Sequence, residues 1–315
     1  MLPLERLQAA QQLIADTLLP TPMLLDHVLS ERLGRSVWLK AELSQRTGSF
    51  KSRGALHWVR TASHQELAGG LGAVSAGNHA LGLAWAAGQA NIPVTIVMPE
   101  DASRFKVEGS RVLGADVILH GDINQAWEKI HTLTEERGLT LVHPYDDERV
   151  IAGQGTVGLE ILAQTPKASV ILCPIGGGGL IAGIGSAAAT LRPGLSVIGV
   201  EPSGAASMAH AWAKGGPSRL DTVTTCAKSL AAAIVGEHSY PICRETTQTL
   251  IQVDETSIAH AVHHLLYQAK LVAEPGAAVG VAALLEGAVT LPPEGDIVVV
   301  VTGGNMSREE LEPFL

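Results

Sequence analysis

Val170-Ile171-Leu172-Cys173-Pro174-Ile175-Gly176-Gly177-Gly178-Gly179 carries the strongest indication of the fold class of this chain. The six apolar residues predict a buried strand, and the glycines lead directly into a stretch with helical patterning. Successive glycine N–H groups can converge on an anion, and a helix N-terminus adds partial positive charge. A flexible turn is the alternative, although four glycines lose much conformational entropy when they are ordered. We therefore expect a strand, a phosphate-binding loop and a helix, in that order.

The glycine loop does not match the common nucleotide-binding patterns. No Gly-Lys-Ser/Thr follows it, and its spacing is not the dinucleotide type. A nucleoside-triphosphate loop is therefore disfavoured at this position, and so is a dinucleotide-binding loop.

Strand and helix patterns alternate over nearly the whole chain, which predicts an α/β fold with mostly parallel sheets flanked by helices. The predicted strands are Val37 to Lys40, Leu71 to Ser75, Val94 to Met98, Asp116 to Leu119, Val170 to Cys173, Val197 to Val200 and Ile297 to Val301. The predicted helices include Leu4 to Leu18, Ala80 to Ala90, Asn124 to Arg137 and Leu180 to Leu191. The strands fall into two groups, so we expect two lobes: a large domain of residues 1–68 and 147–315, and a small domain of residues 69–146.

Composition excludes several classes of protein. The chain has 315 residues, 46% of them hydrophobic, so it can bury a large core. Its net charge of -9 argues against nucleic acid or an anionic membrane as a partner. The three cysteines show no close pairing, and the first residues do not resemble a secretory signal, so we expect a cytoplasmic protein.

Two more junctions place polar residues after predicted strands. Ser75-Ala76-Gly77-Asn78-His79 opens a helix whose first N–H groups could bind a carboxylate, although a simple helix cap explains it as well. Thr302-Gly303-Gly304-Asn305 follows the last strand and could place a hydroxyl against a heterocycle nitrogen; an ordinary turn is the alternative. Ligands of parallel sheets bind beyond the carboxyl ends of strands, where these segments occur.

Lys51 lies in Thr47-Gly48-Ser49-Phe50-Lys51-Ser52-Arg53-Gly54-Ala55, between glycines and next to an aromatic residue. A lysine amine is a nucleophile only when it is deprotonated, and a Schiff base with an aldehyde cofactor is the usual way to hold it ready. Lys51 is therefore a candidate for imine chemistry, provided that the chain also supplies a phosphate site and a carboxylate site.

Together, the Lys51 segment and the three junctions resemble the fold-type II pyridoxal-phosphate enzymes, in the branch of the serine/threonine dehydratases and serine racemases. The resemblance covers almost the whole chain and includes, in order, Met98-Pro99 with Lys106, Gly114-Ala115-Asp116, His143-Pro144-Tyr145-Asp146-Asp147, Ile151-Ala152-Gly153-Gln154-Gly155-Thr156 and Gly199-Val200-Glu201-Pro202. It implies a tryptophan synthase β-like two-lobed fold, pyridoxal 5'-phosphate as cofactor, and a homodimer or homotetramer.

The resemblance also implies roles for single residues. Lys51 would form the Schiff base with the cofactor and later remove the Cα proton of the substrate. Phe50 would lie against the cofactor ring, Asn78 would bind its 3-oxygen, and Thr302 would face its pyridine nitrogen. The phosphate would be bound by Gly176, Gly177, Gly178 and Gly179, and the substrate carboxylate by the loop that holds Ser75, Gly77 and His79.

Two positions bear on the reaction that the resemblance implies. A threonine hydroxyl does not protonate pyridine as an aspartate partner would, which favours rapid loss of a leaving group from Cβ over a long-lived carbanion. In racemases the position of Ala76 carries a serine that protonates the opposite face, and a methyl group cannot donate a proton. We therefore expect α,β-elimination of a β-hydroxy amino acid, L-threonine or L-serine, to a 2-oxo acid and ammonia.

Alternatives remain open. The substrate could be another 3-hydroxy amino acid, such as hydroxyaspartate, phenylserine or a hydroxyectoine-derived compound. An amino-acid racemase is a second possibility, and a catalytically silent amino-acid-binding regulator is a third, which the intact Lys51 disfavours. The chain ends soon after Asn305, at Leu315, so we expect no C-terminal regulatory domain.

Two further segments have an open role. Relatives bind a divalent cation at positions that match Glu201 and Ala205, but Ser207 stands where they carry an acidic residue, which makes this metal site doubtful. Glu274-Pro275-Gly276 resembles a segment near the cofactor, and an N-terminal helix turn explains it equally well.

Overall fold

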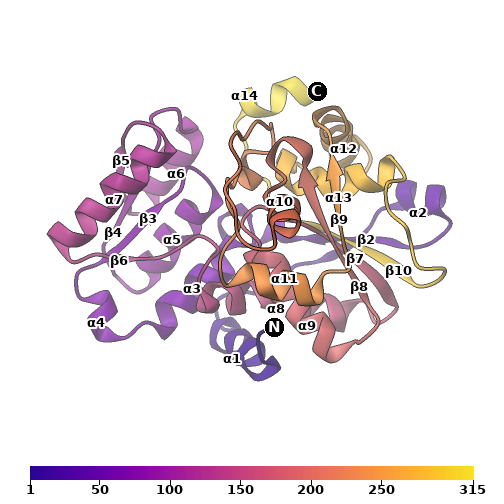
Figure 1. Cartoon of the computed structure of the whole chain (residues 1–315), viewed down its shortest axis with the longest axis horizontal. Coiled ribbons are helices and arrows are strands. Elements are labelled where there is room, and N and C mark those ends of the chain that lie inside the picture. The colour runs from indigo at the N-terminus through magenta and orange to yellow at the C-terminus, as the bar shows by residue number, and fades with distance from the viewer.

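Ten strands form two separate sheets in the computed structural model, which describes residues 1–315 (Figure 1). The strands are β1 (Met23–Leu25), β2 (Val37–Ala41), β3 (Leu71–Val74), β4 (Val94–Met98), β5 (Asp116–Leu119), β6 (Thr140–Leu141), β7 (Ala168–Pro174), β8 (Ser196–Pro202), β9 (Thr249–Val253) and β10 (Asp296–Val301). The larger sheet has the order β1-β2-β10-β7-β8-β9, and the smaller has the order β5-β4-β3-β6.

Helices fill nearly every connection between the strands. They are α1 (Leu4–Ile14), α2 (His27–Leu33), α3 (Lys51–Thr61), α4 (His64–Leu67), α5 (Asn78–Gln89), α6 (Arg104–Val112), α7 (Ile123–Arg137), α8 (Glu148–Gln164), α9 (Gly179–Leu191), α10 (Ser207–Lys214), α11 (Ser239–Thr246), α12 (Glu255–Tyr267), α13 (Pro275–Leu285) and α14 (Arg308–Leu311). Short 3-10 helices are η1 (Glu42–Ser44), η2 (Arg46–Gly48), η3 (Ser203–Ala205), η4 (Lys228–Leu230) and η5 (Glu312–Phe314). None of the helices combines the length and apolar character needed to cross a lipid bilayer.

The larger sheet is parallel except for β1, which pairs antiparallel with β2. Both of its faces are buried, which explains why its central strands are continuous apolar runs such as 297–301. Side chains of one face, including Ile171 and Val298, pack with α1, α8 and α9. Side chains of the other face, including Leu172 and Val299, pack with α12 and α13. Successive residues of a strand thus enter two different cores.

The smaller sheet is entirely parallel and has the same layered construction. Leu71, Ala73 and Ile96 form one core with α3 and α5. Val74 and Val97 point to the opposite face and pack against α7. Asp122 caps α7 through the N–H groups of Asn124 and Gln125, so this helix has a defined start.

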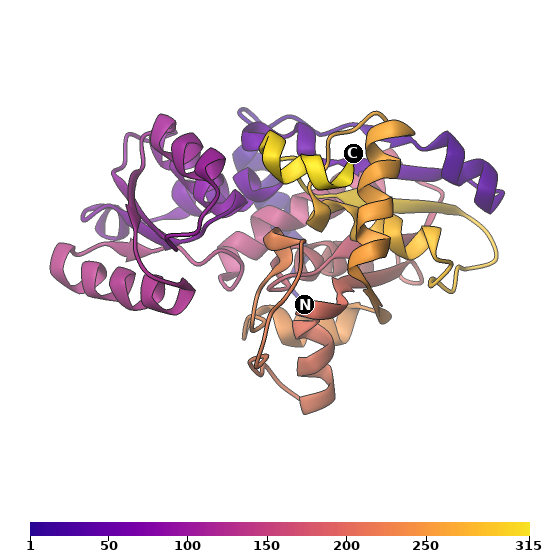
Figure 2. The same cartoon turned by 90° about the horizontal axis from the view of Figure 1, so that it is seen from above.

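The two sheets belong to two lobes that lie side by side in both views (Figures 1 and 2). Helix α3 packs against α8 of the larger lobe and against α5 of the smaller one, so it lies between the two sheets. The exact division into residues 69–146 and the remainder stays a proposal. The larger lobe supplies the strand ends at Pro174 and Val301, and the smaller lobe supplies the strand end at Val74.

The predicted α/β fold is confirmed, and the predicted elements agree with the structure to within a few residues. The strands at 94–98 and 116–119 have the predicted bounds, while β1, β6 and β9 were not predicted. Two of these contain only two or three residues, and β9 lies at an edge of the sheet with polar, exposed positions. The first helix ends at Ile14 rather than Leu18. The N–H groups of Thr17 and Leu18 both donate to the carbonyl of Ile14, which closes the last turn, and Pro20 disfavours a helical conformation of the residue before it.

Candidate active site

Lys51 is the first residue of α3, the helix that packs against both lobes. Its Nζ donates to the carbonyl oxygen of Pro144 at 2.7 Å and lies 5.2 Å from the centre of the Phe50 ring. Burial lowers the pKa of Lys51 to about 8, against the opposing effect of the negative charge of Glu274. A substantial fraction of this amine is therefore neutral at mildly alkaline pH, as a nucleophile requires.

A buried ionic cluster holds the start of α3 in place. Arg53 donates to Glu42 at 2.8 Å and to Glu160 at 2.5 Å, and Lys40 donates to Glu160 at 2.6 Å. All four side chains are buried. The cluster joins α3 to β2, η1 and α8, so the backbone that carries Lys51 is fixed on several sides.

The glycine loop between β7 and α9 has its carbonyl groups bonded and its N–H groups free. The carbonyl of Gly177 accepts from Ser239 Oγ at 2.7 Å and from the N–H of Gly236 at 3.1 Å. The carbonyl of Gly176 accepts from the Ser207 hydroxyl at 3.2 Å. None of the N–H groups of residues 176–179 has a partner within the protein. The loop therefore fits an anion such as a phosphate group, next to the N-terminus of α9.

The glycines of this loop cannot be replaced without rearrangement. A Cβ on Gly177 would lie 2.2 Å from the ring of Tyr145, and Gly178 has a φ of 94°, which L side chains rarely adopt. The predicted loop is thus held by close packing as well as by backbone conformation.

The loop after β3 offers a second set of free N–H groups. Ser75 Oγ accepts from the N–H of Gly77 at 3.1 Å, while the N–H groups of Ala76, Asn78 and His79 have no partner within the protein. The ring of His79 bonds through Nε2 to the carbonyl of Val142 at 3.0 Å. Burial lowers the pKa of His79 to about 3, so the ring is neutral. This loop can bind a carboxylate through its backbone. In the His79 ring, Nε2 is bonded to the smaller lobe, while Nδ1 is buried without a partner within the protein.

Asn78 and Thr302 come together around Gly303. A Cβ on Gly303 would lie 3.1 Å from Asn78 Nδ2 and 3.1 Å from the Cβ of Ser49. The N–H of Phe50 donates to the carbonyl of Thr302 at 3.2 Å, which places the end of β10 beside the lysine segment. Thr302 is buried, and its hydroxyl has no partner within the protein. It is therefore free to bond to a ligand.

The amide of Asn78 is oriented by two neighbours. Its Nδ2 donates to Glu274 at 2.6 Å, and its Oδ1 accepts from Asn305 Nδ2 at 2.8 Å. An amide nitrogen carries two donors, so one N–H of Asn78 remains for an oxygen atom of a ligand.

Asn305 and Tyr145 had no separate role in the sequence-based interpretation, and the role of the segment that contains Glu274 was left open. Glu274 is buried and its pKa is raised by burial, against the opposing charge of Lys106. In the sequence, Glu274 is the one charged residue in the apolar stretch 271–285. A charge in a buried stretch needs a partner, so this pattern could have marked it as a functional residue. Tyr145 carried no such signal, because its contact with Gly177 joins segments that are distant in sequence.

The carboxylate of Glu201 already accepts hydrogen bonds from the backbone of a nearby helix. Its two carboxylate oxygens accept from the N–H groups of Met208 and Ala209 at 2.7 and 2.9 Å, in the first turn of α10. Burial raises the pKa of Glu201 to about 7. Ala205 is buried nearby, and the hydroxyl of Ser207 bonds to the glycine loop. With one carboxylate among the three positions, and with the Ser207 hydroxyl bonded elsewhere, these residues are a poor set of ligands for a divalent cation.

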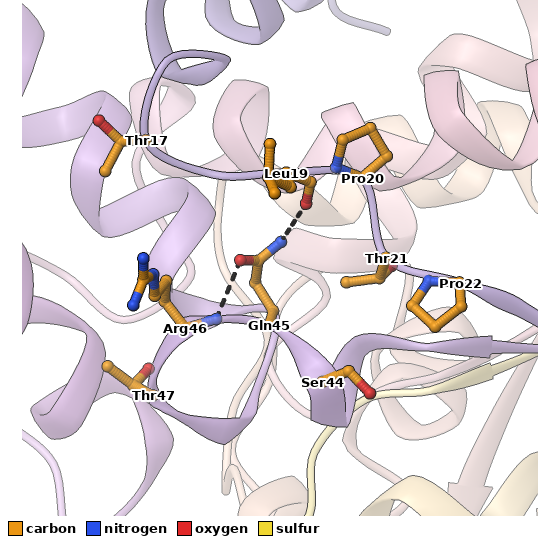
Figure 3. Close-up of a pocket in the computed structure, with 9 residues that line it drawn as sticks. All are labelled: Thr17, Leu19, Pro20, Thr21, Pro22, Ser44, Gln45, Arg46 and Thr47. Atoms are coloured by element: carbon orange, nitrogen blue, oxygen red, sulfur yellow. Dashed lines mark hydrogen bonds between the residues drawn. The ribbon is translucent and has the colours of Figure 1, made fainter.

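A cleft of about 590 Å³ lies beside the segment that precedes Lys51 (Figure 3). Polar residues dominate its lining; within it, Gln45 accepts from the N–H of Arg46 and donates to the carbonyl of Leu19, at 2.9 Å each. Neither the glycine loop nor Asn78 lines this cleft. It is therefore separate from the site around Lys51.

The chain is similar to known proteins over nearly its whole length. A profile of the family described as "Pyridoxal-phosphate dependent enzyme" matches residues 14–303. The chain is 40% identical over 317 aligned positions to the L-threonine ammonia-lyase of Thermotoga maritima, covering 100% of this chain and 78% of that protein. The crystal structure of the T.th. threonine deaminase is similar, with a TM-score of 0.91 and 38% identity over 97% of this chain and 99% of that one. Maize serine racemase has a TM-score of 0.93 and 32% identity, over 98% and 95%.

Proposed function

Because this chain belongs to the family of pyridoxal-phosphate dependent enzymes, we propose that it is an ammonia-lyase that converts L-threonine or L-serine to a 2-oxo acid and ammonia. The observation that carries this proposal is the partly buried amine of Lys51, with a pKa of about 8, close to Pro144 and Phe50. The relatives named L-threonine ammonia-lyase support the choice of substrate.

The cofactor would be held by groups that lack partners within the protein. The N–H groups of Gly176, Gly177, Gly178 and Gly179 would hold its phosphate. The hydroxyl of Thr302 would bond to the pyridine nitrogen, and the free side-chain N–H of Asn78 would donate to the 3-oxygen. Phe50 would lie against the ring. When bound, pyridoxal phosphate withdraws electrons from the substrate and makes its Cα proton acidic.

Lys51 and the loop after β3 have complementary tasks. The N–H groups of Ala76, Asn78 and His79, on the loop that includes Ser75 and Gly77, would bind the substrate carboxylate and fix the direction of the Cα proton. The neutral amine of Lys51 would accept that proton. Its low pKa places the amine near the pH at which a general base is most efficient.

Two side chains support elimination over racemisation. Thr302 provides a neutral partner where a carboxylate would keep a positive charge on the ring nitrogen. Ala76 presents a methyl group beside Ser75, so this position cannot protonate a substrate from the opposite face. Racemisation is the second candidate, because maize serine racemase shares the fold at 32% identity.

The decisive experiment measures release of 2-oxo acid and ammonia from a panel of β-hydroxy amino acids by the purified protein. The panel contains L-threonine, L-serine, hydroxyaspartate, phenylserine and a hydroxyectoine-derived compound, with Lys51→Ala as the inactive control. We expect the highest kcat/KM with L-threonine or L-serine. Absence of 2-oxo acid from every substrate, together with cofactor bound to the wild type, would favour the amino-acid-binding regulator.

We further propose that the enzyme is cytoplasmic and forms a homodimer or homotetramer, with no nucleic-acid or membrane partner. The negative net charge supports the absence of a nucleic-acid partner. Light scattering after size-exclusion chromatography would give the mass of the assembly, and a monomeric mass would contradict the proposal.

A further inference from the structure

The segment of residues 215–238, between α10 and α11, is unusually long for a connection with so little regular structure. Its one regular element is the short helix η4. Irregular connections longer than about 12–15 residues are uncommon in compact domains and are often functional. In both views the segment lies on the side of the larger lobe that is nearer to the smaller lobe (Figures 1 and 2).

This 215–238 segment packs directly against the glycine loop. The N–H of Gly236 donates to the carbonyl of Gly177 at 3.1 Å. A Cβ on Gly176 would lie 3.2 Å from the Cα of Leu230. The segment therefore holds the carbonyl group of Gly177 by a hydrogen bond and packs against Gly176, in the loop whose N–H groups have no partner within the protein.

Tyr145 and Asp146 attach the end of the segment to the connection between the lobes. The hydroxyl of Tyr145 donates to the carbonyl of Ile234 at 2.9 Å. The two oxygens of the Asp146 carboxylate accept from the N–H groups of Glu237 and His238 at 3.0 and 2.8 Å. In each of these bonds a side chain binds a backbone group that lies 89 to 92 positions later in the sequence.

Tyr145 and Asp146 also contact one glycine each, the first in the glycine loop and the second in the 215–238 segment. The ring of Tyr145 fills the space next to Gly177, and a Cβ on Gly236 would lie 2.3 Å from Asp146 Oδ1. Pro144, which precedes them, accepts the hydrogen bond of Lys51. One short stretch of chain thus contacts the catalytic amine, the phosphate-binding loop and the 215–238 segment.

We propose that Tyr145 and Asp146 are positioning residues that hold the 215–238 segment against the glycine loop and so set the affinity for the phosphate group of the cofactor. The proposal rests on the cofactor of the proposed function and is independent of its substrate. A purely structural role would lower stability without changing the preference for a phosphorylated over an unphosphorylated ligand.

The test measures cofactor binding to the apo-protein. Pyridoxal phosphate and pyridoxal, which lacks the phosphate, are titrated separately, and absorbance and fluorescence report binding. One neutral hydrogen bond corresponds to a factor of about 3 to 10, so we expect Tyr145→Phe to weaken pyridoxal phosphate binding by that factor. Asp146→Asn removes a charged acceptor and should weaken it about 10- to 100-fold. Pyridoxal binding should change less than about twofold in both variants.

A second readout does not depend on the cofactor. Trypsin can cleave the 215–238 segment at Arg219 and Lys228, both exposed. Both variants should be cleaved at these sites faster than the wild type, with other sites unchanged. Matched controls are Tyr240→Phe, whose hydroxyl has no partner within the protein, and Asp221→Asn, an exposed carboxylate of the same segment.

The outcomes separate this proposal from the assignment of the cofactor. Wild-type affinity for pyridoxal phosphate and wild-type cleavage rates in both variants would overturn the proposal. Equal loss of affinity for both ligands would also overturn it, since the effect would then be on Lys51 or on stability. Failure of the wild type to bind pyridoxal phosphate at all would contradict the proposed function instead.

Discussion

The surroundings of Lys51 set the pKa of its amine. An exposed lysine has a pKa of about 10.4, and burial lowers that of Lys51 to about 8. Glu274 opposes the shift through its negative charge, but its own pKa is raised by burial. The contact of Glu274 with Asn78 at 2.6 Å ties this carboxylate to the orientation of a candidate cofactor ligand.

The rate at which the apo-protein captures pyridoxal phosphate should depend on the protonation of Lys51. Only the neutral amine attacks an aldehyde, so the second-order rate constant should rise with pH and level off above about 8. Stopped-flow absorbance between pH 6 and pH 10 would measure it, with Lys51→Ala as the control. A rate constant that still increases steeply at pH 10 would show that burial does not lower this pKa.

Ala76→Ser should introduce racemisation. A hydroxyl at this partly buried position could donate a proton to the face opposite Lys51, and acid catalysis of this kind contributes about 10²- to 10⁴-fold. We expect the ratio of D-serine formation to pyruvate formation to rise at least about tenfold above that of the wild type. Chiral chromatography and a coupled pyruvate assay would give the ratio. An unchanged ratio would mean that residue 76 does not face Cα.

Helices α8 and α9 approach each other through glycines. A Cβ on Gly183 of α9 would lie 2.6 Å from the backbone nitrogen of Gly155 in α8. Backbone atoms cannot move aside as a side chain can, so this pair of glycines sets the distance between the two helices. Because α9 starts at the glycine loop, its position also sets that of the candidate phosphate site.

Gly183→Ala should therefore lower stability and disturb the phosphate site. Overpacking of this kind costs about 1–3 kcal/mol, which urea unfolding of the apo-protein would detect. The affinity for pyridoxal phosphate should also fall, because a shift of α9 moves the glycine loop. Gly216→Ala is the matched control, because a Cβ there has no atom within 4 Å, and we expect a change below about 0.5 kcal/mol. Equal stability of the two variants would contradict the close contact between α8 and α9.

The buried ionic cluster connects the larger sheet to the helix between the lobes. Lys40 comes from β2, Glu42 from η1, Arg53 from α3 and Glu160 from α8. Burial alone would raise the pKa of Glu160, but Arg53 and Lys40 together hold it below its usual value. A lowered pKa adds stability that is present above the unfolded-state pKa and is lost as the pH falls.

Glu160→Gln should destabilise the protein strongly, since it leaves Arg53 and Lys40 with one carboxylate fewer. Removing one partner of a buried pair costs about 3–5 kcal/mol, which urea unfolding at pH 7 would measure. The difference in the free energy of unfolding between the variant and the wild type should shrink as the pH is lowered below 4.5. The Glu160 carboxyl of the wild type then becomes protonated and loses its attraction to Arg53 and Lys40. Glu108→Gln removes an exposed pair with Arg111 and should change stability by less than about 1 kcal/mol. Similar losses in the two variants would contradict a structural role for the cluster.

Much of the fold could be predicted because local patterns and tertiary structure agree in its interior. The apolar runs at 94–98 and 297–301 form central strands, and the four glycines after 175 lead into α9. The short strand β6 could not be predicted, because two residues have no period of their own and pair only when β3 is in place. Edge strand β9 is half exposed, so its pattern differs little from that of a loop.

The amino-acid sequence by itself predicted the groups of the candidate site: a lysine, a glycine loop, an amide and a hydroxyl, each at a strand end or helix start. These signals are local, since each depends on residue types within a few positions. The partners of those groups depend on the tertiary structure. Contacts such as Tyr145 with Gly177, Glu274 with Asn78 and Asp146 with residues 237–238 join distant parts of the chain. No local pattern encodes such contacts, because they arise only when two sheets and the helix between them are packed together.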